Sequence, residues 1–81
     1  MALIITRPTQ STTFPDGSGR NAVVRNDSGQ HFLVSEVHRG QGFTRIDETL
    51  VFPCDTEGNV TVWSEVFSGD SVEDALQNFH G

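Results

Sequence analysis

The stretch that decides the fold is Glu48–Val66, ETLVFPCDTEGNVTVWSEV. It consists of two apolar runs rich in β-branched and aromatic residues, joined by Cys54-Asp55-Thr56-Glu57-Gly58. Two such runs around a short segment that contains glycine are typical of a β-hairpin, so we predict one antiparallel hairpin over residues 48–66. Pro53 has no amide hydrogen to donate, and it therefore marks the end of the first strand or an edge of the sheet.

The second run of this hairpin contains the only tryptophan of the chain. If this run is a strand, its side chains alternate between two faces. One face then carries Thr61, Trp63, Glu65 and Phe67, and the other carries three valines and a serine. Apolar groups on both faces indicate a strand that is buried on both sides or that lies in a dimer interface. We take these four residues as candidate interface residues, and the alternative is that Trp63 completes the core.

A second hairpin is predicted upstream of the first. Asn21–Asn26 and His31–Val37 are β-branched or aromatic runs on either side of a turn that contains glycine. Ahead of them, Ala2–Ile5 is short and apolar and predicts a strand. Residues 7–20 are rich in Thr, Ser, Gly and Pro, and they form either a loop or a weak strand at Ser11–Phe14.

Two further segments predict chain reversals. Pro15-Asp16-Gly17-Ser18 has the residues of a turn, because proline presets φ, aspartate bonds to the backbone and glycine accepts positive φ. Arg39-Gly40-Gln41-Gly42 is a second break, and its two glycines suit a turn or a bulge.

The end of the chain changes from a strand pattern to a helix pattern. Ser71 is a helix N-cap candidate, and the acids that follow it suit the positive end of the helix dipole. One apolar stripe is formed by Val72, Ala75, Leu76 and Phe79. A helix of about two turns is marginal alone, so it must dock on the sheet. We therefore predict a single α+β domain over residues 1–81, with a mostly antiparallel sheet of four to six strands and one short C-terminal helix.

Charge is distributed unevenly along the chain. The five positive residues are all arginines and lie in residues 1–45, whereas eight of the eleven acids lie from Asp47 onward. The net charge of −6 divides into +2 for residues 1–46 and −8 for residues 47–81. Such a surface repels phosphate and argues against direct binding of nucleic acid. The acidic half is a solvated face, a mimic of a nucleic-acid backbone, or a surface that docks on a basic host protein.

The residues that could carry chemistry lack the spacing that chemistry needs. The thiol and imidazole groups of the chain belong to Cys54, His31, His38 and His80. They form none of the paired spacings of zinc sites. Nothing basic lies near Cys54 in the sequence to lower its pKa, so the simplest interpretation is an inert, partly buried thiol. We predict no catalytic residue, no metal and no cofactor.

Features of export and of membrane insertion are missing from the sequence. A single cysteine cannot form an internal disulfide. The apolar start Ala2-Leu3-Ile4-Ile5 is too short for the core of a signal peptide, and no apolar run approaches the ~20 residues of a membrane helix. We expect a cytoplasmic protein that does not contact a membrane.

The predicted hairpin resembles a family of small proteins of unassigned function that are encoded by bacteriophages of actinobacteria. The shared pattern is E-T-apolar-V-F-x-x-D-x-x-G-x-V-x-x-W, formed here by Glu48, Thr49, Leu50, Val51, Phe52, Asp55, Gly58, Val60 and Trp63. An acidic short helix with Asp74-Ala75-Leu76 follows, so the resemblance covers roughly residues 48–76. It implies a phage accessory protein that acts in the cytoplasm of a bacterial host. Because the family has no assigned activity, the resemblance assigns none to this chain.

These observations favour a non-enzymatic protein-binding module that binds a host protein and forms a homo-oligomer. One alternative is an acidic decoy that occupies a nucleic-acid-binding protein, for which binding would be sensitive to salt. Another is a minor component of the virion or of its assembly.

Overall fold

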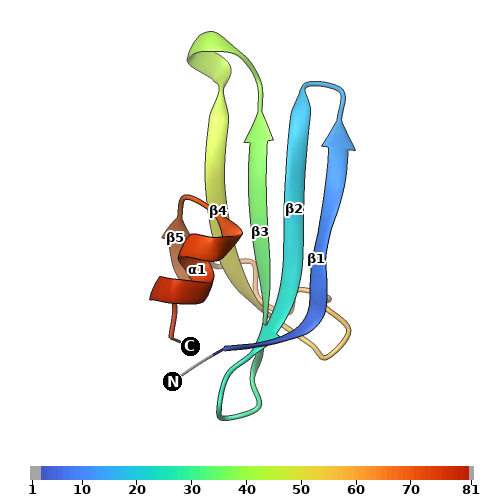
Figure 1. Ribbon diagram of the computed structural model, residues 1–81, viewed down its shortest axis with the longest axis vertical. Helices are drawn as coiled ribbons and strands as arrows, with labels where there is room; N and C mark the ends of the chain where they lie inside the picture. The colour runs from blue at the N-terminus through green and yellow to red at the C-terminus, as the bar shows by residue number, and fades with distance from the viewer. Residues whose placement is uncertain (1–2, 81) are drawn as a thin grey trace.

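Five antiparallel strands follow one another across one sheet in the order of the chain, and a single helix packs on one face (Figure 1). The computed structural model describes residues 3–80, so Ala2 of the predicted first strand lies outside the described residues. The elements are β1 (Ile4–Phe14), β2 (Gly17–Arg25), β3 (His31–Arg39), a 3₁₀ turn (Gly42–Thr44), β4 (Ile46–Cys54), β5 (Phe67–Gly69) and α1 (Val72–Asn78). The predicted α+β class, with one short C-terminal helix, is confirmed. Within residues 3–80, no helix is long and apolar enough to cross a membrane.

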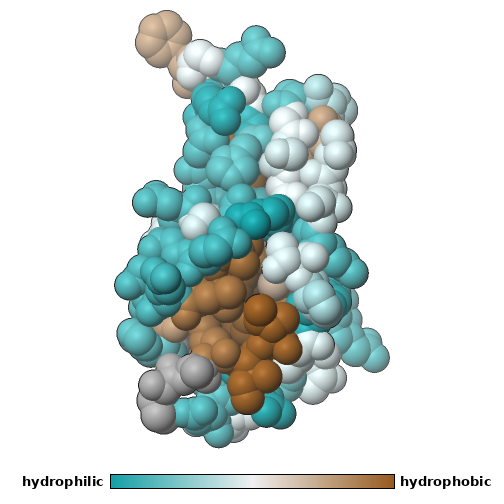
Figure 2. All heavy atoms as spheres, in the orientation of Figure 1, coloured by the Kyte–Doolittle hydropathy of each residue, from teal (hydrophilic) through white to brown (hydrophobic). Residues whose placement is uncertain are grey.

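The core lies between α1 and the half of the sheet that α1 covers. Its buried members are Val24, Phe32, Val34, Val51, Val72, Ala75 and Phe79. The ring of Phe79 meets the ring of Phe32 edge to face, with centroids 4.9 Å apart, and also contacts the ring of Phe67 at 5.8 Å. Figure 2 shows apolar surface gathered beside α1 and mostly hydrophilic surface over the strand ends that extend beyond it. Burial of each large apolar side chain contributes about 1.5–3 kcal/mol, so this one cluster supplies the main attraction between helix and sheet.

The predicted helix is confirmed, together with its cap. Ser71 accepts a hydrogen bond from the amide of Asp74, with 3.0 Å between the hydroxyl oxygen and the nitrogen. Val72 and Ala75 of the predicted stripe are fully buried, Phe79 is nearly so, and Leu76 packs against the same cluster. The apolar stripe is therefore what fixes the helix on the sheet.

The predicted hairpin between Asn21 and Val37 is also confirmed, as β2 and β3, with Arg25 opposite His31 at its closed end. The side-chain oxygen of Asn26 accepts hydrogen bonds from the amides of Ser28 and Gln30, at 3.0 and 2.9 Å. Gly29 has a φ of +82°, which a residue with a side chain rarely adopts.

The loop alternative for residues 7–20 is wrong, because β1 continues to Phe14 and β2 begins at Gly17. The strand alternative is correct but too short. Tertiary contacts offset the weak strand preference of this segment. The ring of Phe14 covers Gly19, and the guanidinium of Arg39 lies over that ring at 4.3 Å from its centroid.

The predicted hairpin over residues 48–66 is only half correct. Its first strand is β4, but the second run is not a strand: only Val60 pairs, with Cys54, and the chain rejoins β4 where Phe67 lies opposite Val51. Between these two contacts, β4 contributes two residues, Phe52 and Pro53, and the returning chain contributes six, residues 61–66. Pro53 is one of those two, and it has no amide hydrogen with which to hold a neighbouring strand. The returning strand is β5, and residues 61–66 form an excursion that we call the Trp63 segment.

Candidate binding surface

The Trp63 segment leaves the sheet from a tight turn built on Asp55. One carboxylate oxygen of Asp55 accepts hydrogen bonds from the amides of Glu57 and Asn59, both at 2.9 Å. These amides and the carboxamide of Asn59 favour the charged form, and they hold the pKa of Asp55 below its usual value. Gly58 completes the turn with a φ of +88°. Turn chemistry therefore fixes the point at which the segment begins.

The same turn is also fixed against the face of the sheet that α1 does not cover. A side chain at Gly58 would lie 2.9 Å from a methyl group of Val23 and 3.0 Å from the guanidinium of Arg7. Arg7 donates to the carbonyl of Glu57 at 3.4 Å and to the side-chain oxygen of Asn21 at 3.1 Å. In Figure 1 the connection between β4 and β5 accordingly passes behind the sheet, on the side opposite α1. Contacts to β1 and β2 thus hold the base of the Trp63 segment in place.

Trp63 itself lies outside the core. It is 76% exposed, and its ring meets the ring of Phe52 edge to face, with centroids 5.3 Å apart and planes at 62°. Phe52 belongs to β4, and Pro53 follows it directly. Two valines of the same segment, Val62 and Val66, are 51% and 48% exposed. An exposed aromatic ring that packs against a second ring and has apolar neighbours is typical of a protein-binding hot spot.

The structure separates the four candidate interface residues. Thr61, Trp63 and Glu65 lie exposed on the Trp63 segment. Phe67 lies in β5, where it packs against the core beneath α1. Its alternation with Trp63 is lost because the segment between them is not a strand. The structure instead places Trp63 against Phe52, which sequence reasoning did not select.

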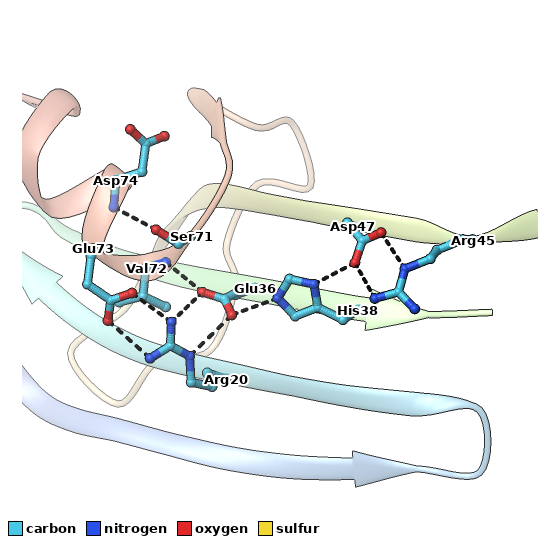
Figure 3. Close-up of polar contacts among 9 residues, drawn as sticks. All are labelled: Arg20, Glu36, His38, Arg45, Asp47, Ser71, Val72, Glu73 and Asp74. Carbon is cyan, nitrogen blue, oxygen red and sulfur yellow. Dashed lines mark hydrogen bonds and ion pairs between the residues drawn. The ribbon is translucent and has the colours of Figure 1, made fainter. Parts of the chain in front are cut away.

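A network of charged side chains joins α1 to the face of the sheet that α1 covers (Figure 3). Glu36 of β3 is only 5% exposed. Its carboxylate accepts hydrogen bonds from the Arg20 guanidinium at 2.7 and 3.2 Å and from the amide of Val72 at 2.7 Å. Arg20 continues to Glu73 of α1 at 2.7 Å. The network therefore fixes the first turn of α1 against β2 and β3.

His38 extends this network along β3. Its Nε2 lies 2.8 Å from a Glu36 oxygen, and its Nδ1 lies 2.7 Å from an Asp47 oxygen, which also accepts from Arg45. A carboxylate only accepts hydrogen bonds, so this arrangement favours the charged imidazole, in which both ring nitrogens donate. Asp47 and Glu36 accordingly raise the pKa of His38. The chemical effect of this arrangement is to keep the carboxylates of Glu36 and Asp47 paired with positively charged side chains.

The carboxylates of the network are held in their charged form. Hydrogen bonds from Arg20 lower the pKa of Glu36 to about 2, against the cost of burying it. Arg45 and His38 lower the pKa of Asp47 to about 2. Sequence analysis did not identify this network. The available signal was alternation along β3, which places Glu36 on the same face as the buried Phe32 and Val34.

The structure brings the Cys54 thiol and the His31 imidazole onto neighbouring positions, which their separation in the sequence does not predict. Cys54 lies directly opposite His31 in the β3–β4 register, whereas His38 pairs with Asp47 on the other face. Burial raises the pKa of the Cys54 thiol, so the thiol stays protonated near neutral pH. Among residues 3–80, no group of three or more His, Cys, Asp or Glu side chains could hold a metal ion.

A second exposed aromatic residue lies far from the Trp63 segment. Phe43 is fully exposed in the 3₁₀ turn between β3 and β4. Gly40 and Gly42 flank it with φ of +84° and +57°. In Figure 1 this turn is the end of the molecule that is farthest from α1.

Comparison with protein-family models, with curated protein sequences and with solved structures gave no match.

Proposed function

We propose that this chain is a non-enzymatic protein-binding module, a phage accessory protein that binds a bacterial host protein in the host cytoplasm and self-associates. The observation that carries the proposal is the exposure of Trp63, at 76%, on a segment whose base is fixed to the sheet. A tryptophan left in water costs the free protein hydrophobic energy, and a partner that covers it recovers that energy.

Preorganisation supports the same proposal. Association loses affinity when loops must be ordered on binding. Here the turn at Asp55, the close packing of Gly58 on Val23 and the ring contact with Phe52 order the Trp63 segment before any partner arrives. Glu65 is exposed on this segment, which suits a partner with a basic residue beside an apolar pocket.

Affinity capture from a lysate of an actinobacterial host tests the proposal. The wild-type chain should retain one host protein, and Trp63→Ala should lower the affinity for it by at least about 30-fold, as expected for truncation of a hot spot of 2 kcal/mol or more. Phe43→Ala is the matched control, because it truncates another exposed aromatic ring at the far end of the molecule. It should retain the host protein as well as wild type does.

The proposal fails if wild type retains no host protein, or if a folded Trp63→Ala variant retains the same one equally well. Capture repeated at high salt and with added DNA separates the acidic decoy from the apolar interface. Retention that survives both conditions supports the Trp63 segment, whereas loss under both supports the decoy.

A further inference from the structure

The outer edge of β1 has no strand beside it, because β1 is first in the sheet order. β1 has 11 residues, whereas the opposite edge strand, β5, has three. A long unpaired edge can pair with another chain, and proteins usually protect such edges with charges, prolines or bulges. Pro8 and two shifts of register protect the first half of β1 in this way.

The second half of β1, Gln10–Phe14, lacks this protection. It pairs in unbroken register with residues 17–21 of β2. Its sequence, QSTTF, contains neither charge nor proline, and the side chains of residues 10–13 are exposed. Threonine and serine side chains on neighbouring strands form favourable cross-strand pairs. The strand therefore offers an edge that is unbroken and uncharged.

The direction of its main-chain groups follows from the neighbouring ladder. The amide of Gly40 donates to the carbonyl of Asp16 at 3.0 Å. In an antiparallel ladder, this bond makes the adjacent pair, Gly17 and Arg39, one that exchanges no hydrogen bonds. The amide and carbonyl of Gly17 are therefore directed toward Phe14 of β1.

Alternation along β1 then settles the remaining residues. Thr12 and Gln10, like Phe14, direct their main-chain groups toward β2. Ser11 and Thr13 direct theirs away from β2, toward the open edge. Two residues of an exposed strand thus hold amides and carbonyls ready to bond with another strand.

The distribution of charge indicates which chain fits this edge. Asp47 and Glu48 lie on β4, and Asp70, Glu73 and Asp74 lie in or just before α1, so none of these acids is on β1. The acidic turn at Asp55–Glu57 meets β1 at Arg7, outside Gln10–Phe14. Two copies that meet through Gln10–Phe14 keep these acids apart. The edge at β5 is short and is followed at once by Asp70, so it does not suit pairing between copies.

We infer that two copies of this chain associate by antiparallel pairing of Gln10–Phe14, which joins their sheets into one. A register centred on Thr12 places Ser11 of one copy opposite Thr13 of the other and forms about four main-chain hydrogen bonds. It also places the two Thr12 side chains opposite each other, with Cβ atoms roughly 4.5–5.5 Å apart. The inference deepens the self-association within the proposed function, and it does not involve the Trp63 segment.

Sedimentation of the purified chain over a concentration series tests this inference. Wild type should dimerise at low salt and at high salt alike, because main-chain pairing between uncharged strands is not screened. Ser11→Pro should be monomeric, since it removes an outward amide hydrogen and leaves the β1–β2 ladder intact. Circular dichroism of Ser11→Pro checks that it keeps the wild-type fold.

A charge exchange at Thr12 tests the register. Thr12→Lys and Thr12→Glu should each weaken the dimer about fivefold, because like charges then lie opposite each other. An equal mixture of the two variants should dimerise more tightly than either variant alone. The side chain of Thr12 is exposed in the monomer, so neither substitution should alter the fold.

The inference is overturned if wild type is monomeric at every concentration, if folded Ser11→Pro dimerises as wild type does, or if the dimer dissociates at high salt. The last result would instead assign the contact to pairing of the positive and negative halves. Capture of a host protein through Trp63 is a separate measurement, so failure of one does not decide the other.

Discussion

At the scale of single residues, the charged network makes stability depend on pH in two directions. His38 has its pKa raised above the ordinary 6.5 by two carboxylates. Its contribution is therefore complete below pH 6.5 and is lost as pH rises through the raised pKa. Glu36 and Asp47 have pKa values lowered to about 2 from 4.5 and 3.8. Their contribution is complete above those ordinary values and is lost as pH falls toward 2.

We therefore expect the free energy of unfolding to be highest between about pH 4.5 and 6.5 and to decrease on both sides. Urea unfolding at a series of pH values measures this profile. His38→Gln should remove the decrease on the alkaline side and leave the decrease on the acid side. His80→Gln, at an exposed position beyond α1, should keep the wild-type profile. An alkaline decrease that persists in His38→Gln would assign it to another group.

At the scale of elements, a comparison of two glycines distinguishes the cost of backbone strain from the cost of a packing collision. Gly29 and Gly58 have nearly equal φ, +82° and +88°. A side chain at Gly29 would meet nothing within 4 Å, whereas one at Gly58 would collide with Val23 and Arg7. Alanine at Gly29 should therefore cost about 1 kcal/mol from strain alone.

Alanine at Gly58 should cost about 1–3 kcal/mol more than alanine at Gly29, because the turn must move off the sheet. It should also change the fluorescence of Trp63, while Gly29→Ala leaves it unchanged. Denaturant unfolding and emission spectra of both variants measure this. Equal costs and unchanged emission would mean that the turn does not hold the Trp63 segment.

Elements with strong turn chemistry could be predicted from the sequence. The β2–β3 turn and the Ser71 cap each carry a side chain that bonds to the backbone, and such contacts are local. The full length of β1 could not be predicted, because its strand state depends on Phe14 packing over Gly19 and under Arg39, which lie on other strands.

The second half of the 48–66 hairpin shows the limit of alternation. Val60, Val62 and Val66 alternate as a strand would, yet only Val60 forms a bridge with β4, and Val66 only donates its amide to the carbonyl of Val51. Valine has a high strand propensity, but propensity does not provide a partner strand, and the neighbouring Pro53 removes one ladder hydrogen bond. The candidate surface was predicted in part for the same reason: Trp63 was selected, and its support by Phe52 was not.

At the scale of the whole molecule, one face of the sheet carries the helix and its charged network, and the other carries the fixed turn from which Trp63 extends. The molecule measures 41 × 22 × 21 Å, so residues on different ends of the sheet can bind without interfering with each other. Gln10–Phe14 lies next to the β1–β2 turn, whereas the Trp63 segment bonds to Val51 and Pro53 toward the other end of the strands. A dimer paired as we propose would therefore leave the Trp63 segment of each copy uncovered.

Acrylamide quenching of the fluorescence of Trp63, the only tryptophan, tests most directly whether this surface is open in the free protein and covered in the complex. We predict quenching close to that of a free indole compound for the chain alone, and clear protection once the captured host protein is bound. An indole already shielded in the free chain, or one equally quenched in the complex, would contradict the account.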